Sequence, residues 1–417
     1  MEAITELVPP SRPWATLSPD MVGEISIRVR DAADFVRLHA VCIPWRESAP
    51  SPAAIRPTRF LPWPLALCKD LLVHVPLNFG RRLSPWTTSP YHRGCDAVLL
   101  PRPRASSSSA SGDDNWVPRA KNWVARADGT AAWFLTVHPE PTMTDLVTGA
   151  IRVLPRFEEN DDGRINRGME KCSGIIYSDG TIFVYSVDSG DFTAAILRPG
   201  DAAWTIAEKS VYFGERCHHS SAAYHDGKIL VCMNLQFWFV LMPDFEGNGA
   251  TGGGRLEMKS GASTSARDAV KHEGSYIFES GNELMWATVI SKRRPTYGYT
   301  GYAMTSTLSL TLHALEEANS GRMRLVPRDG QSLRDRVLFL GSPASFTTKA
   351  TTEFGGCAYF VFNSCVYKYN LINGVAQLME RVPAGWGSDM AHVWIQPRPA
   401  IEPIDKIREK LKAPTKE

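Results

Sequence analysis

Apolar positions near the start of the chain follow a helical spacing. Met21, Ile25 and Val29 recur every four residues, which places them in one stripe along a helix. Ser18 is a typical N-cap residue, and Pro19 suits the first helical position. This segment therefore predicts a short helix that begins just after Ser18.

A second helix is predicted to begin at Asp31, with Asp34 three residues later in the manner of a capping box. Its apolar side chains share one face (Phe35, Leu38, Val41 and Cys42), and Pro44 interrupts it. Helices this short cannot bury their apolar stripes alone, because chains below about 40 residues usually need a partner. Residues 11–50 thus predict a helical module that packs on another protein or on the rest of this chain.

From residue 60 onward the polar and apolar pattern becomes that of short strands. Turn dipeptides between β-rich runs recur at intervals of 47 to 55 residues (Asp128-Gly129, Asp179-Gly180, Asp226-Gly227 and Gly281-Asn282). The segments 145–154 and 370–379 also resemble each other and lie 225 residues apart, which equals five steps of 45. Repeats of this length, each with several strands, are typical of a β-propeller.

These patterns predict a mainly β fold with an N-terminal α-helical module, in which short helices precede a six- or seven-bladed β-propeller. Residues 51–115 are expected to hold a linker, an irregular first blade and a Ser-rich loop, and residues 116–400 the propeller. Apolar residues at helical spacing in 401–417 predict a C-terminal helical tail. Large aromatic residues beside the strand runs are expected to fill the space between blades.

Composition and charge narrow the location and the partners. The 417 residues carry a formal net charge of +2, which offers no electrostatic attraction for nucleic acid or for an acidic membrane surface. The eight cysteines show no C-x-x-C pair, which favours a reducing compartment. The first residues lack the pattern of a secretory signal, and no apolar run reaches membrane-spanning length. We therefore expect a cytoplasmic or nuclear protein, or one found in both.

No motif in the sequence predicts catalysis. Cys217-His218-His219 has no partner at zinc-like spacing, so we expect neither a metal site nor another cofactor. The segment 186–193 resembles the Asp-box turn of sialidase-type propellers, but no carboxylate pair for glycoside cleavage accompanies it. A Gly-x-Ser-x-Gly elbow is also missing. The expected protein is not an enzyme.

The N-terminal segment resembles an F-box. The chain has Leu17-Ser-Pro19-Asp20-Met21 with Ile25, then Asp34-Phe35 through Val41-Cys42, and finally Trp45-Arg46, in the order and spacing of that family. The remainder is similar to the propeller-like domain of unknown function that commonly follows F-boxes in plant proteins. Phe339-Leu-Gly341, Cys357-Ala-Tyr-Phe360 and Trp394-Ile-Gln-Pro397 carry this second resemblance, whereas residues 65–120 depart from the family pattern.

The resemblance implies a substrate-recognition subunit of an SCF-type cullin–RING E3 ubiquitin ligase, which takes part in protein ubiquitination through protein–protein interaction. The F-box would dock on a Skp-type adaptor that carries the cullin and the RING subunit, and the propeller would bind a target protein. Carried over by position, the adaptor-binding residues would be Leu17, Pro19, Asp20, Met21, Ile25, Val29, Phe35, Leu38, Val41 and Trp45. Ile25, Phe35 and Val41 have an alternative role as contacts between the helices. Two other functions stay open: a propeller that binds a carbohydrate or another small ligand without a ligase role, and a sialidase-like hydrolase.

Overall fold

The computed structural model divides the chain into two compact units, one of Met1–Leu61 with Gln396–Glu417 and one of Pro62–Ile395. It describes residues 17–29, 35, 38–39, 41–50, 62–68, 71–74, 97–98, 122–137, 140–145, 151–157, 169, 172–188, 191–210, 220–225, 228–232, 238–243, 256–260, 271–292, 304–317, 323–350, 355–363, 365–381 and 392–396. The predicted C-terminal tail, the Ser-rich loop and the predicted start of the second helix lie outside the described residues.

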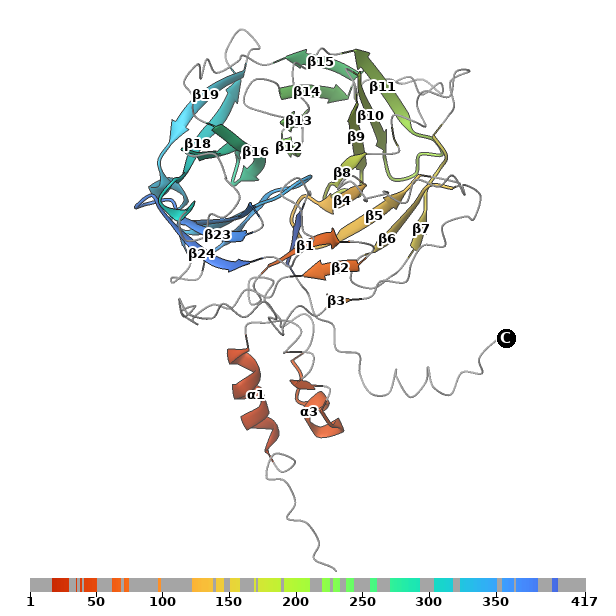
Figure 1. The fold of residues 1–417 in the computed structure, drawn as a ribbon. Helices are drawn as coiled ribbons and strands as arrows, with labels where there is room; N and C mark the ends of the chain where they lie inside the picture. The colour runs from red at the N-terminus through yellow and green to blue at the C-terminus, as the bar shows by residue number, and fades with distance from the viewer. Residues whose placement is uncertain are drawn as a thin grey trace, which may run out of the picture. The chain divides into compact units, whose positions relative to one another are not determined.

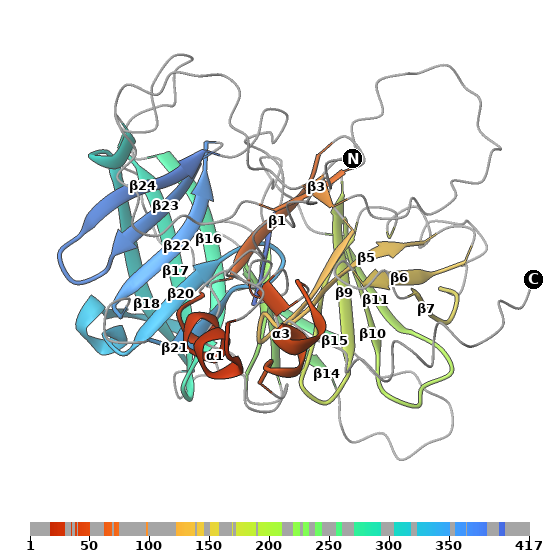
Figure 2. The ribbon, with the colours of Figure 1, turned by 90° about the horizontal axis from the view of Figure 1, so that it is seen from below.

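The first unit contains the helices α1 (Pro19–Arg28) and α3 (Ile43–Glu47), which lie next to each other in Figures 1 and 2. The predicted start of α1 is confirmed: Pro19 opens the helix, and the backbone N–H of Met21 donates to the Ser18 hydroxyl at 3.4 Å. Phe35, Leu38 and His39 are also helical. None of the helices among the described residues is long and apolar enough to cross a membrane.

The second unit is built from β-sheets, and its described strands group into blades of four or five. The first blade joins the two ends of the unit: β1 (Trp63–Cys68), β2 (Leu71–His74), β3 (Ala97–Val98) and β25 (Val393–Ile395). The second holds β4 (Trp123–Arg126), β5 (Ala132–Thr136), β6 (Thr142–Asp145) and β7 (Ile151–Val153). The third holds β8 (Ser173–Ile176), β9 (Ile182–Asp188), β10 (Asp191–Leu197) and β11 (Thr205–Ser210). These two blades form one eight-stranded sheet because β4 and β8 pair in parallel.

Three more blades follow along the chain. The fourth holds β12 (Ser221–His225), β13 (Lys228–Cys232), β14 (Trp238–Pro243) and β15 (Leu256–Ser260). The fifth holds β16 (Lys271–Ser280), β17 (Glu283–Ser291), β18 (Leu308–Glu317) and β19 (Met323–Arg328). A short 3-10 helix, η4 (Gly330–Leu333), leads to the sixth blade, which holds β20 (Arg336–Leu340), β21 (Phe346–Lys349), β22 (Cys357–Phe362), β23 (Cys365–Asn370) and β24 (Val375–Arg381). The described strands thus form six blades, arranged in a ring in Figure 1. The prediction of a mainly β, propeller-like fold is confirmed.

Three of the four predicted hairpin turns are among the described residues, and all three are present. Gly129, Gly180 and Gly281 have φ angles of +71°, +91° and +66°, a region that glycine enters without steric cost. They connect β4 to β5, β8 to β9 and β16 to β17, which are antiparallel pairs. The repeated dipeptides therefore mark the turn after the first strand of a blade.

The first blade is completed by the last described strand. Trp63 pairs with Ile395, and Leu65 pairs with Val393, so that residues more than 300 apart in sequence share a ladder. The indole N–H of Trp394 donates to the Leu340 carbonyl at 2.9 Å. This links the closing strand to the sixth blade as well as to β1. The expected linker and irregular first blade at 51–115 thus overlap three strands of a complete sheet.

Aromatic side chains fill the interior beside the closing strand. Phe339 lies 5.3 Å, between ring centroids, from each of Phe346, Tyr359 and Trp394. All four side chains are buried. Gly129 lies against the ring of Phe346, where no room remains for a Cβ atom. The interior near the sixth blade is therefore closely packed.

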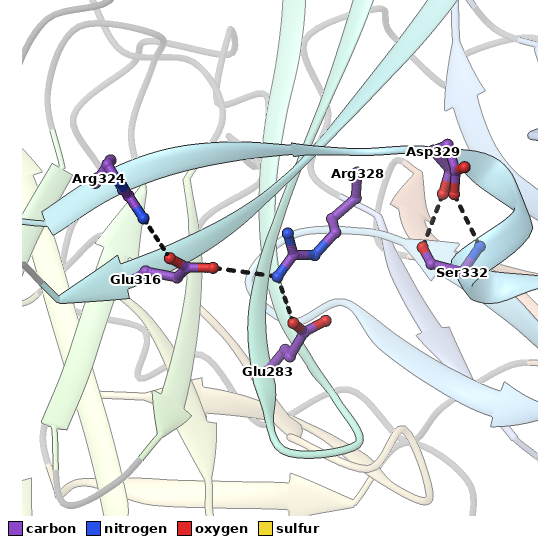
Figure 3. A network of polar contacts seen from close by, with 6 residues as sticks. All are labelled: Glu283, Glu316, Arg324, Arg328, Asp329 and Ser332. Carbon is purple, nitrogen blue, oxygen red and sulfur yellow. Dashed lines mark hydrogen bonds and ion pairs between the residues drawn. The ribbon is translucent and has the colours of Figure 1, made fainter.

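A network of ion pairs crosses the outer strands of the fifth blade (Figure 3). Arg328 donates to Glu316 at 3.2 Å and to Glu283 at 2.5 Å, and Arg324 donates to the other Glu316 oxygen at 2.8 Å. The hydrogen bonds from Arg324 and Arg328 lower the pKa of Glu316. Nearby, Asp329 caps η4 by accepting from the Ser332 N–H at 3.1 Å. These groups balance one another in charge and support the strands.

Candidate functional site

The helical module has a small core in which polar and apolar side chains alternate. Val22 and Ser26 are the buried residues of α1, and Phe35, His39 and Trp45 complete the core. The ring of Phe35 meets the His39 ring edge-on at 4.8 Å. The inward face of α1 is therefore the Val22–Ser26 face, and the predicted stripe of Met21 and Ile25 lies elsewhere on the helix.

His39 connects the two described helices through hydrogen bonds. Its Nδ1 lies 2.6 Å from the Trp45 carbonyl oxygen, and its Nε2 lies 3.0 Å from the Ser26 hydroxyl. A carbonyl only accepts, so the proton is assigned to Nδ1, and Nε2 accepts from Ser26. The side chain has no exposed surface. His39 thus fixes α3 against α1 with directional bonds in a core too small to be held by apolar contacts alone.

Several apolar side chains of the module face solvent. We define the apolar docking surface as Met21, Ile25, Val41 and Ile43, whose exposed fractions are 54%, 39%, 63% and 46%. Met21 and Ile25 are four residues apart and share one face of α1. Ile27 is also exposed, at 66%, but lies about 200° around the helix from Ile25. Exposed apolar side chains gathered on so few residues are typical of a protein-interaction site.

The predicted adaptor-binding residues fall into two groups. Pro19, Asp20, Met21, Ile25 and Val41 are exposed, and Leu17, Val29 and Leu38 are half-buried. The alternative role as helix–helix contacts is therefore wrong for Ile25 and Val41.

Phe35 and Trp45 form the second group, because 0% and 7% of their surfaces are exposed. They hold the module together rather than face solvent, and this changes the role inferred from their positions. Sequence reasoning missed Ile43, which precedes the helix-breaking Pro44, and Ile27, which lies outside the four-residue spacing. It also missed His39, because a single histidine in a short helix has no distinctive pattern.

Within the described part of the propeller, no group of three or more His, Cys, Asp and Glu side chains could hold a metal ion. The segment 186–193 belongs to the β9–β10 hairpin, where Ser186 pairs with Thr193. Burial raises the pKa of the Cys172 thiol to about 12, so this cysteine stays protonated at neutral pH. Cys217-His218-His219 lies outside the described residues.

Comparison with known protein families gives a match to the KIB1-4 β-propeller over residues 98–377. The chain belongs to the KIB1-4 β-propeller family. The family region begins at β3 and ends within β24, so it includes neither the helices α1 and α3 nor the closing strand β25. No curated protein matches the chain.

Solved structures similar to this KIB1-4 propeller chain are distant from it in sequence. YjhT is 14% identical, with a TM-score of 0.26 over 63% of this chain and 93% of its own. The WD40 domain of SCAP from fission yeast is 11% identical, with a TM-score of 0.29 over 64% of this chain and 57% of its own. A mutant α-L-arabinanase of Cellvibrio cellulosa is 10% identical, with a TM-score of 0.27 over 62% and 90%.

Proposed function

We propose that this chain is the substrate receptor of an SCF-type cullin–RING ubiquitin ligase. In this proposal the helices dock as an F-box on a Skp-type adaptor, and the KIB1-4 propeller holds a target protein for ubiquitination. The chain itself carries out no catalysis and acts in the cytoplasm, the nucleus or both. The single observation that supports this most directly is the apolar docking surface on the helical module.

The geometry of the module fits such a role in two ways. The core side chains Val22, Ser26 and His39 are buried, so the module has a defined shape before a partner binds. Met21 and Val41 remain more than half exposed, and their burial would contribute free energy to binding. A few apolar side chains commonly supply most of the affinity of an interface.

The proposal is tested by isothermal titration of the full chain with a purified Skp-type adaptor. Truncation of Met21 and Val41 to alanine removes apolar atoms that are about half exposed, worth about 1 kcal/mol each when buried. The Met21→Ala/Val41→Ala variant should therefore bind about 30-fold more weakly than the wild type. Its stability should change little, because both side chains face solvent.

Val375→Ala provides a matched control, because Val375 in β24 is 57% exposed and belongs to the propeller. This variant should bind the adaptor like the wild type. Equal affinity of wild type and Met21→Ala/Val41→Ala would remove the apolar docking surface from the proposal. Hydrolysis of an aryl glycoside by the purified chain would instead support the alternative of a sialidase-like enzyme.

A further inference from the structure

Side chains from three neighbouring blades meet at the turn after each first strand. Tyr177 precedes the β8–β9 turn, Tyr224 and His225 end β12, and Glu279 lies next to the end of β16. The innermost strands β8, β12 and β16 are neighbours in this order. Their ends therefore form one continuous surface, although the residues are about 50 apart in sequence.

Printed contacts connect these residues step by step. The rings of Tyr177 and Tyr224 lie 4.7 Å apart, and the Nδ1 atom of His225 lies 3.6 Å from Glu279 Oε1. Successive residues of a strand point to opposite faces. Tyr224 therefore faces the third blade, while His225 faces the fifth. The charge of Asp179, two residues after Tyr177, also acts on the Tyr177 hydroxyl.

The exposed groups of this surface are an aromatic ring and carboxylates. Tyr224 is 36% exposed, Asp179 is exposed, and the Glu279 side chain is 52% exposed. Asp179 accepts from the N–H and hydroxyl of Thr181, and no Lys or Arg of the described residues forms an ion pair with it. Glu279 has only the His225 contact at 3.6 Å among the described ion pairs. The surface is locally negative on a chain whose formal net charge is +2.

A second observation also points to a ligand. The Tyr177 hydroxyl is buried and makes no hydrogen bond within the described part of the chain. Burial raises the pKa of Tyr177, so the phenol remains neutral and keeps lone pairs free to accept. An N–H donor beside the tyrosine pair would give this hydroxyl the partner that buried polar groups normally have.

We propose that the surface of Tyr224, Asp179 and Glu279 binds an arginine or lysine side chain of a partner protein. The Tyr224 ring offers a face for a cation, and the two carboxylates supply the opposite charge. In the ligase proposal this side chain belongs to the target, so the identity of the partner as a target rests on the proposed function. Binding of the cationic side chain itself does not depend on that function.

The test measures binding of a fluorescent arginine–glycine heptapeptide to the full chain, with a glutamate–glycine heptapeptide as the probe of opposite charge. The net positive charge of the chain disfavours the arginine peptide, so its binding requires a local site. Only the arginine peptide should bind, and added salt should weaken the binding. Failure of the arginine peptide to bind overturns the inference.

Variants assign the site to these residues. Tyr224→Ala and Glu279→Gln should each weaken binding about two- to fivefold, whereas Tyr224→Phe keeps the ring and should bind like the wild type. Glu140→Gln is the matched control, because Glu140 is an exposed carboxylate paired with Arg156 in the second blade. Equal losses in Glu140→Gln and Glu279→Gln would contradict the assignment.

Lys228, opposite His225 in the β12–β13 register, gives a variant of opposite sign. Lys228→Ala removes a positive charge from the hairpin and should strengthen binding of the arginine peptide. Adaptor binding, measured on the same variants, should not change. Loss of adaptor binding in the wild type with intact peptide binding would reject only the ligase proposal, and the reverse result would reject only this inference.

Discussion

Substitution of Trp394 by phenylalanine tests how the ring of blades is closed. Trp394 lies in β25, is 1% exposed, and donates its indole N–H to the Leu340 carbonyl at 2.9 Å. Phenylalanine keeps an aromatic ring but removes this donor and about three heavy atoms. The Leu340 carbonyl retains its contact with His392 Nε2 at 3.1 Å, so no buried acceptor is left without a partner.

The expected loss of stability follows from these contacts. Removal of a hydrogen bond whose acceptor keeps another partner costs about 1 kcal/mol. The cavity left by the smaller ring, roughly 40 Å³, costs about 1 kcal/mol more, and the lost burial of apolar atoms adds a similar or smaller amount. Trp394→Phe should therefore lower the free energy of unfolding by about 2–3 kcal/mol.

The assay is urea unfolding of the full chain, followed by circular dichroism, with Trp133→Phe as a control. Trp133 in β5 is only partly buried, and its replacement should cost less than about 1 kcal/mol. An unchanged midpoint for Trp394→Phe would refute the reasoning. Equal losses in both variants would show that the closing strand has no special role in holding the propeller together.

Three further predictions concern the helical core, cysteine reactivity and the ion-pair network. His39→Ala leaves two buried polar groups without partners and should destabilise the module by about 2–4 kcal/mol, seen as faster hydrogen exchange of the amides in α1. At pH 8 iodoacetamide should modify the half-buried Cys42 before Cys172, because burial raises the pKa of Cys172 to about 12; equal labelling in the folded chain would contradict this. Glu316 has a lowered pKa in the folded state, so its contribution to stability is present above its unfolded pKa of about 4.3 and is lost as pH falls through the lower folded value. Glu316→Gln should therefore reduce the acid dependence of the urea midpoint, and an unchanged dependence would contradict this.

Local signals in the sequence were sufficient for the elements that depend on neighbouring residues. Ser18 and Pro19 define the start of α1 because an N-cap acts within one turn. Gly129 and Gly281 mark hairpins because a positive φ angle is needed at one residue of the turn. These features are independent of the rest of the fold, so the pattern alone could predict them.

Features that depend on distant residues could not be read in the same way. Pairing of Trp63 with Ile395 places both ends of the second unit in one sheet, and neither segment carries a signal for the other. The four-residue spacing of Met21 and Ile25 predicted a shared face, but not that this face is exposed while Val22 and Ser26 are buried. Tyr177, Tyr224 and Glu279 belong to separate blades, and only the ring brings them together.

The central claim is that the helical module attaches this KIB1-4 propeller chain to a ubiquitin ligase. Its most direct test is size-exclusion chromatography of the full chain mixed with a purified Skp-type adaptor and cullin. The account predicts one complex that contains all three proteins, and loss of the chain from that complex in the Met21→Ala/Val41→Ala variant. Separate elution of the wild-type chain from the adaptor and cullin would contradict the account.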